Sequence, residues 1–155
     1  MDILKTFILP GLALLPPGMD SPEARAMLYA IGMQESLRFK HRRQVGGPAH
    51  GFWQFERGGG ISGVLGHAAT RGHILKVCAE LVISPTEDEC YEAVTYNDPL
   101  ACCFARLLLW TLPTSLPLRD GSQRGWEQYL SAWRPGKPHP ETWEGYFKEA
   151  WERIA

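Results

Sequence analysis

The segment Leu100–Trp110 constrains the fold more than any other part of the chain. It is apolar on nearly every side, and Arg106 is its only charged residue. A helix of this composition is stable only when other elements surround it. Asp98 and Pro99 suit its first turn, where proline is tolerated, and Pro113 marks a position beyond its end. The sequence therefore predicts a helix buried at the centre of a domain.

Apolar residues recur at helical spacing in several further stretches. The predicted helices cover residues 21–37, 61–81 with a break at Arg71–Gly72, 86–93, 126–133 and 143–154. Ser21 and Thr86 are placed to cap two of these helices, because their hydroxyls accept hydrogen bonds from backbone N–H groups in the first turn. We expect the aromatic side chains of Trp126, Trp143 and Trp151 to enter the core.

Residues 44–56 depart from the helical pattern. Four turn-forming residues, Gly46, Gly47, Pro48 and Gly51, precede the short aromatic run 52–55. This composition predicts a loop or a small β-hairpin. Since 155 residues are enough for one hydrophobic core, we predict a mainly α, compact single domain over residues 1–155.

The first residues contain an apolar stretch, Phe7–Leu15, which is interrupted by Pro10–Gly11. A membrane-spanning helix needs about 20 apolar residues, so this stretch is too short. No small-residue cleavage site follows it, as a signal peptide would require. We therefore expect the segment to stay on the protein and pack against the core, without membrane insertion.

The four cysteines are Cys78, Cys90, Cys102 and Cys103, and no two of them form a Cys-x-x-Cys pair. Zinc is not indicated, and the histidines show no metal-ligand spacing either, so we expect no metal and no cofactor. The sequence favours four reduced thiols, with a Cys78–Cys90 bridge as the alternative.

Charge argues against one class of function. Lys and Arg number 16 against 17 Asp and Glu, a net charge of -1, whereas a protein held on phosphates is basic. A basic stretch, Arg38–Arg43, remains; it suits either a solvated surface or contact with an anionic polymer. A nucleic-acid-binding protein using this stretch is the weaker interpretation.

Glu35 is the informative residue of the helix at 21–37. It follows Ile31 by four positions and Leu28 by seven, so its carboxyl shares the apolar face. Burial penalises the charged form and raises a carboxyl pKa, which suits a general acid near neutral pH. The alternative is an ordinary ion pair with a nearby arginine. The candidates for that pair are Arg38, Arg42 and Arg43.

Gln34-Glu35-Ser36 at the end of a predicted helix is followed by a loop that contains Gly51-Phe52-Trp53-Gln54. These motifs and their order resemble the catalytic Glu-Ser at a helix end and the subsequent Gly-x-x-Gln loop of lytic transglycosylases and goose-type lysozymes. The central apolar helix and residues 132–136, Ala-Trp-Arg-Pro-Gly, resemble the family's central helix and Ala-Tyr-Asn-x-Gly motif. The resemblance spans about residues 21–136.

Three positions depart from the family pattern. Trp133 replaces the motif tyrosine. In the family the hydroxyl of this tyrosine contacts the catalytic glutamate, so here the hydroxyl is missing unless Tyr129 or Tyr96 supplies it. Arg134 replaces the motif asparagine, and Trp53 replaces a methionine.

The resemblance implies cleavage of the β-1,4 bond between N-acetylmuramic acid and N-acetylglucosamine, with Glu35 as general acid and base. A lytic transglycosylase closes a 1,6-anhydro ring with this single carboxylate, whereas a goose-type lysozyme uses water. The expected substrate contacts are Ser36, Phe52, Trp53, Gln54 and Trp133, and Trp133 is alternatively a core residue. Glu56 is the candidate second carboxylate; Asp98 is a remoter one and more simply a helix cap. His50 lies beside the loop and is a further candidate for the cleft.

The compact form and the absence of a convincing signal peptide resemble phage-encoded cell-wall lysins. Such a protein is made in the cytoplasm and reaches the wall after holin-type release or as part of a virion. Its implied partners are peptidoglycan glycan strands, with no nucleic acid, and a monomer is the expected state. A non-catalytic virion or structural protein on a lysozyme-like scaffold is the alternative.

Overall fold

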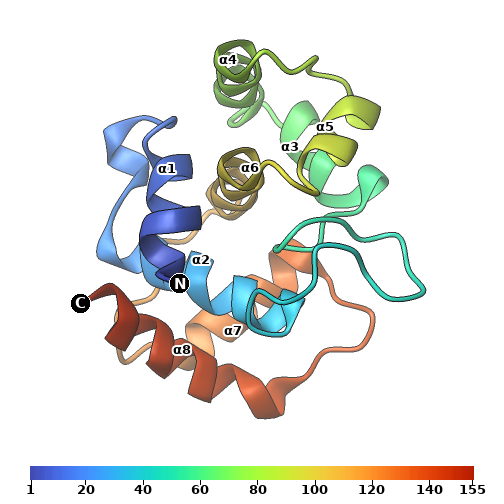
Figure 1. Ribbon diagram of the computed structural model, residues 1–155. Coiled ribbons are helices and arrows are strands. Elements are labelled where there is room, and N and C mark those ends of the chain that lie inside the picture. The colour runs from blue at the N-terminus through green and yellow to red at the C-terminus, as the bar shows by residue number, and fades with distance from the viewer.

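Helix α6 (Asp98–Trp110) lies at the centre of the molecule and is seen almost end-on in Figure 1. The computed structural model describes residues 1–155. Every residue from Leu100 to Leu109 is buried, which confirms the predicted central helix. The cap differs from the prediction, because the side chain of Asn97, rather than that of Asp98, accepts the hydrogen bond from the Leu100 amide at 3.1 Å.

The other helices surround α6. Helix α1 packs on one flank and α3 and α4 on another, while α2, α7 and α8 lie together below α6 in the view of Figure 1. Their bounds are α1 (Leu9–Leu12), α2 (Pro22–Ser36), α3 (Ser62–Gly66), α4 (Arg71–Leu81), α5 (Glu87–Ala93), α7 (Ser122–Trp133) and α8 (Pro140–Ile154). Single turns of π- or 3-10 helix occupy Leu4–Ile8, Pro17–Met19 and Arg57–Ile61. The chain is therefore mainly α and compact, as predicted.

Local signals placed most helix ends correctly. The Ser21 hydroxyl accepts from the Ala24 amide at 3.1 Å, and the Thr86 hydroxyl accepts from the Glu89 amide at 3.2 Å. The predicted break at Arg71–Gly72 is wrong, because Arg71 begins α4 and the break lies at residues 67–70. Thr70 stabilises this earlier break, since its hydroxyl donates to the Val64 carbonyl at 2.7 Å.

Helix α2 ends in an unusual reversal that also fixes the position of Glu35. Leu37, Arg38 and Phe39 all have positive φ values, 48°, 64° and 63°. Non-glycine residues adopt this region at a cost, so other contacts must hold them there. The Ser36 hydroxyl accepts from the Phe39 amide at 3.0 Å, and the Phe39 ring packs directly over Gly32.

Residues 44–56 form a loop with two isolated antiparallel bridges and no continuous strand. His50 and Phe55 exchange two backbone hydrogen bonds of 2.9 and 2.8 Å. Gly51 has φ +81°, and a Cβ there would lie 2.6 Å from the Val94 carbonyl oxygen, so the turn requires glycine. This matches the predicted loop or hairpin.

The N-terminal segment packs on the core, as expected. Phe7, Ile8, Leu12 and Leu15 are buried, and the Cys102 thiol donates to the Ile8 carbonyl at 3.4 Å. All four cysteines are buried and free. No helix combines the length and the apolar character needed to cross a bilayer.

Candidate functional site

Glu35 lies in the last turn of α2, where it is half-buried. The hydroxyl of Tyr129, on α7, donates a hydrogen bond to Oε1 of Glu35 at 2.7 Å. No arginine pairs with Glu35, so the alternative interpretation as an ordinary ion pair is wrong. The three nearby arginines pair elsewhere: Arg38 with Glu149, Arg42 with Asp98, and Arg43 with Glu92.

This environment raises the pKa of Glu35 from 4.5 to about 7. Burial is the larger cause, because it removes water from the charged form. The Tyr129 hydrogen bond acts in the opposite direction and lowers the pKa, since a hydroxyl donor stabilises the carboxylate. The carboxyl is thus able to hold a proton near neutral pH and to exist as a carboxylate after releasing it.

Aromatic rings on α7 and α8 hold the ring of Tyr129 in place. Its ring stacks on Trp143 with centroids 5.5 Å apart and an interplanar angle of 7°, and it also contacts Trp126 and Trp133. Burial and the neighbouring Glu35 raise the pKa of Tyr129, so its hydroxyl stays protonated and remains a donor. Tyr96 is 68% exposed, so Tyr129 is the tyrosine that contacts Glu35.

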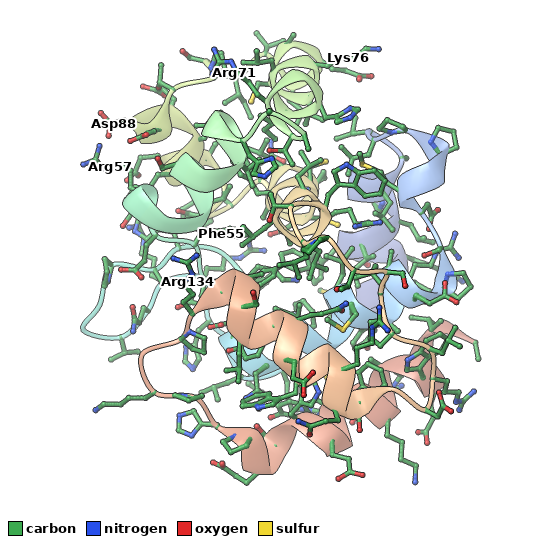
Figure 2. All side chains as sticks on the ribbon, turned by 180° about the vertical axis from the view of Figure 1, so that it is seen from behind. Phe55, Arg57, Arg71, Lys76, Asp88 and Arg134 are labelled. Carbon is green, nitrogen blue, oxygen red and sulfur yellow. The ribbon has the colours of Figure 1, made fainter.

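The glycine-rich loop joins the same region through Trp133. The indole N–H of Trp133 donates to the Trp53 carbonyl at 2.8 Å, and the Phe55 ring stacks against Trp133 with centroids 6.0 Å apart. Figure 2 shows Phe55 close to Arg134, the residue that follows α7. The end of α2, the loop 51–55 and the last turns of α7 therefore meet, although they are far apart in the sequence.

Three of the five expected substrate contacts are buried, and these predictions are corrected. The Ser36 hydroxyl donates to the Gly32 carbonyl at 2.6 Å in the last turn of α2. Trp53 is 0% exposed, and its indole N–H donates to the Leu28 carbonyl at 2.9 Å. Phe52 is 4% exposed beneath the Arg42 guanidinium, whose carbon lies 4.2 Å from the ring centroid. These side chains support the site from inside and present almost no surface to a ligand.

Gln54 and Trp133 retain partial exposure. Gln54 has φ 52° and its side-chain amide donates to the Gly51 carbonyl at 2.9 Å, which closes the turn. Trp133 packs against the core on one side, as the core interpretation expects, and is half-buried, so the rest of its surface is exposed. These two side chains are the remaining candidates for contact with a ligand beside Glu35.

The other candidate residues differ in their accessibility. Glu56 is exposed, and its side chain forms neither an ion pair nor a hydrogen bond. Asp98 is 9% exposed and accepts two hydrogen bonds from Arg42, at 2.7 and 3.0 Å. His50 is 6% exposed and stacks on Tyr91 at 3.9 Å, so the expectation that it lines a cleft is corrected to a supporting role.

Sequence reasoning missed one group of side chains next to Glu35. The Gln34 amide donates to the His139 carbonyl at 2.9 Å and accepts from the Thr142 hydroxyl at 2.9 Å. These bonds attach the turn before α8 to the end of α2. They join residues more than 100 positions apart, so no local pattern indicates them.

Comparison of the chain with protein-family models, with curated proteins and with solved structures finds no match. No group of three or more His, Cys, Asp or Glu side chains is arranged to hold a metal ion.

Proposed function

We propose that this protein cleaves the β-1,4 bond between N-acetylmuramic acid and N-acetylglucosamine in peptidoglycan, with Glu35 as general acid and base. The observation that carries the proposal is the environment of Glu35. Its carboxyl has no cationic partner, has a pKa of about 7, and accepts a hydrogen bond from the buried Tyr129. A carboxyl held in this way is suited to donate a proton to a glycosidic oxygen.

The proposed reaction is that of a lytic transglycosylase. Protonated Glu35 donates its proton to the bridging oxygen as the bond from that oxygen to the muramic C1 breaks. The resulting carboxylate then accepts the proton of the muramic C6 hydroxyl, and O6 bonds to C1 to close a 1,6-anhydro ring. Tyr129 stabilises the carboxylate between the two steps, because it donates to Oε1.

The carboxylates around the site favour this single-residue mechanism over goose-type hydrolysis. Asp98 is held by Arg42, which leaves Glu56 as the candidate for a second carboxylate. Glu56 is exposed to solvent, and no hydrogen bond or ion pair orients its carboxylate toward Glu35. A hydrolase would use Glu56 to direct water, so Glu56→Gln distinguishes the two: it leaves a transglycosylase active and inactivates the hydrolase.

A non-catalytic virion or structural protein is the second candidate. The observation in its favour is the burial of Ser36, Phe52 and Trp53, which removes three expected substrate contacts. In either case we infer that the partner is the glycan strand, reached after release from the cytoplasm or within a virion.

The deciding experiment digests purified peptidoglycan with the wild-type protein and with Glu35→Gln, and analyses the products by mass spectrometry. We expect 1,6-anhydro-muramic products from the wild type and a loss of about 10²- to 10⁴-fold in the variant. Glu127→Gln is the matched control, because this carboxylate lies exposed on α7 two positions before Tyr129. Products with reducing ends that have gained water support the hydrolase, and no products from the wild type contradict both enzymatic readings.

A further inference from the structure

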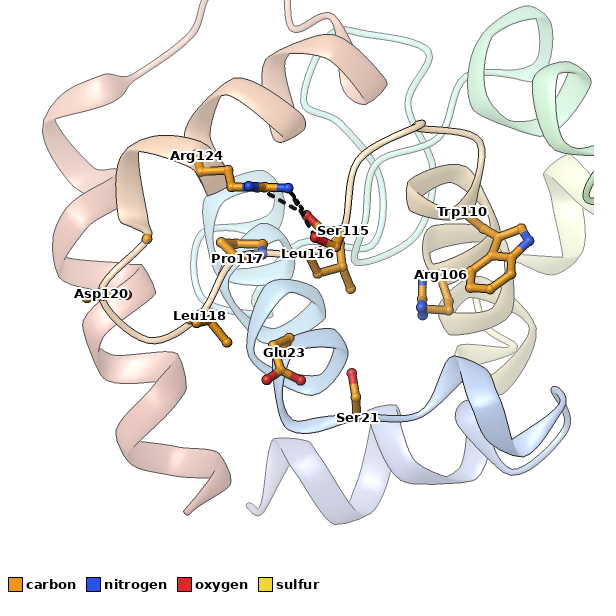
Figure 3. A pocket seen from close by; sticks show the side chains of 11 residues that line it. Ser21, Glu23, Arg106, Trp110, Ser115, Leu116, Pro117, Leu118, Asp120 and Arg124 are labelled. Carbon is orange, nitrogen blue, oxygen red and sulfur yellow. Dashed lines mark hydrogen bonds between the residues drawn. The ribbon is translucent and has the colours of Figure 1, made fainter.

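A second candidate site lies at the other end of α2. A cavity of about 640 Å³ opens between the start of α2, the end of α6, the segment 115–121 and the first turn of α7. Figure 3 shows its lining side chains, including Glu23 from α2 and Arg106 and Trp110 from α6. Glu23 precedes Glu35 by 12 positions, which is about 18 Å along a helix, so this cavity is separate from the site described above.

Arg106 is the residue that points to a ligand. It is only 5% exposed, and its single hydrogen bond runs from Nε to the Met19 carbonyl at 2.7 Å. Its two terminal nitrogens have no hydrogen-bond partner in the protein, and no carboxylate pairs with it. Figure 3 shows the guanidinium at the wall of the cavity, between Trp110 and Ser21.

A largely buried guanidinium that forms no direct ion pair is unfavourable, because part of its hydration is lost and no hydrogen bond to a carboxylate replaces it. The same burial lowers the pKa of Arg106 to about 10. The Trp110 ring, 5.2 Å from the guanidinium carbon, offsets part of this desolvation cost through a cation–π interaction. The two free nitrogens form the planar fork that binds a carboxylate through two parallel hydrogen bonds.

The remaining charges of the cavity restrict the ligand further. Arg124 is engaged by Ser115, to which it donates at 2.8 and 3.1 Å, as the dashed lines of Figure 3 show. Glu23 and Asp120 also line the cavity, so its two arginines are balanced by two carboxylates. A multiply charged anion would be repelled by these carboxylates, whereas a ligand with one negative and one positive group complements both ends.

The cavity also has an apolar wall. Leu116 and Leu118 line it, and Leu118 is 64% exposed. Trp110 is 41% exposed at the opposite edge. An apolar ligand side chain would cover this surface and remove it from water.

We propose that this cavity binds a zwitterion of the amino-acid or short-peptide class. Its carboxylate contacts the free nitrogens of Arg106, its ammonium group faces Glu23, and its apolar side chain lies against Leu116 and Leu118. The proposal rests on Arg106 and its surroundings and is independent of the reaction at Glu35.

The test is an NMR titration that follows the indole N–H signal of Trp110, assigned with Trp110→Phe. The probes are the dipeptide leucyl-alanine, N-acetyl-leucine, leucine amide and inorganic phosphate. We expect a saturable shift with leucyl-alanine, a weaker one with N-acetyl-leucine, and none with the other two. A response to leucine amide equal to that of the dipeptide overturns the proposal, as does preferential binding of phosphate or no saturable shift with the dipeptide.

Two variants sharpen the result. Arg106→Lys keeps the charge but loses the fork, so the dipeptide should bind about tenfold more weakly or worse. Glu23→Gln should weaken the dipeptide but leave N-acetyl-leucine, which lacks the ammonium group, unchanged. Glu23 is half-buried in the first turn of α2 and forms no ion pair, so this variant keeps the test decisive even where Arg106→Lys does not fold. Wild-type dipeptide affinity in Glu23→Gln contradicts the proposal.

Discussion

The Tyr129 hydroxyl and the Glu35 carboxyl are joined by a hydrogen bond of 2.7 Å between α7 and α2. The bond opposes the effect of burial on the pKa of Glu35, and the net result is a value of about 7. The balance between these two influences leads to three predictions, on the pH dependence of the reaction, on Tyr129 and on stability.

The first prediction concerns the pH dependence of peptidoglycan cleavage. The free enzyme needs the protonated form of Glu35, so kcat/KM should fall tenfold per pH unit above about pH 7. The measurement is the initial rate of solubilisation of purified peptidoglycan between pH 5 and 9, with substrate well below saturation. A rate that declines above pH 5, as for an ordinary carboxyl, would contradict the assignment of Glu35 as the acid.

The second prediction concerns Tyr129→Phe. This change removes a donor to the carboxylate while keeping the ring that stacks on Trp143, so the pKa of Glu35 should rise further. The fall in kcat/KM should then begin at a higher pH than in the wild type, and the maximal rate should be lower, because the carboxyl is less firmly positioned. A Tyr96→Phe control, which alters an exposed tyrosine, should leave the profile unchanged. Identical profiles for Tyr129→Phe and the wild type would show that the hydrogen bond has no role.

The third prediction links Glu35 to stability. Its pKa is raised in the folded state, so the native protein binds more protons than the unfolded chain once the pH exceeds about 4.5. The free energy of unfolding should therefore decline as the pH rises from about 4.5 through 7. Above that range, Glu35 should cause no further decline. Partial solvation limits the effect to roughly 2 kcal/mol.

Glu35→Gln isolates this contribution, because glutamine does not titrate. The variant should gain stability relative to the wild type as the pH rises, which urea unfolding at pH 5 and pH 8 would measure. Equal differences at the two pH values would show that the Glu35 carboxyl is not desolvated.

The fourth prediction concerns the pair of Arg42 and Asp98, which attaches the chain before the loop 44–56 to the start of α6. Asp98→Asn leaves the Arg42 guanidinium without its counter-charge, and should cost about 1–3 kcal/mol of unfolding free energy. The exposed pair of Arg57 and Asp88 supplies the control, since Asp88→Asn should cost less than about 1 kcal/mol. Equal losses in the two variants would mean that the first pair does not anchor the loop.

The sequence predicts those parts of the fold that depend on neighbouring residues. Caps such as Ser21 and Thr86 act within three positions of the groups they satisfy, and the all-round apolar character of residues 100–109 leaves α6 no position except the centre. The break between α3 and α4 was misplaced, because Gly72 suggested a stop, while the actual stop depends on the hydrogen bond from Thr70 back to Val64.

The site was predicted less completely, because its geometry depends on distant partners. The helical position of Glu35 indicates its apolar surroundings. The sequence does not show that Arg38 pairs with Glu149, 111 positions away, and so leaves Glu35 without a cationic partner. Aromatic residues were the hardest to place. The sequence favours contact between Trp53 and the sugar substrate. In the structure its indole N–H instead donates a hydrogen bond to a backbone carbonyl of α2 inside the core. Nothing in the local pattern separates these two roles.

The packing of the first residues against α6 sets an order of events during synthesis. Ile8 emerges from the ribosome 94 positions ahead of Cys102, its hydrogen-bond partner. Until α6 has been translated, the apolar stretch 7–15 has no core to enter and offers a hydrophobic segment to chaperones. We expect ribosome-bound chains that stop before residue 98 to remain protease-sensitive in this segment, and chains that extend past residue 133 to protect it.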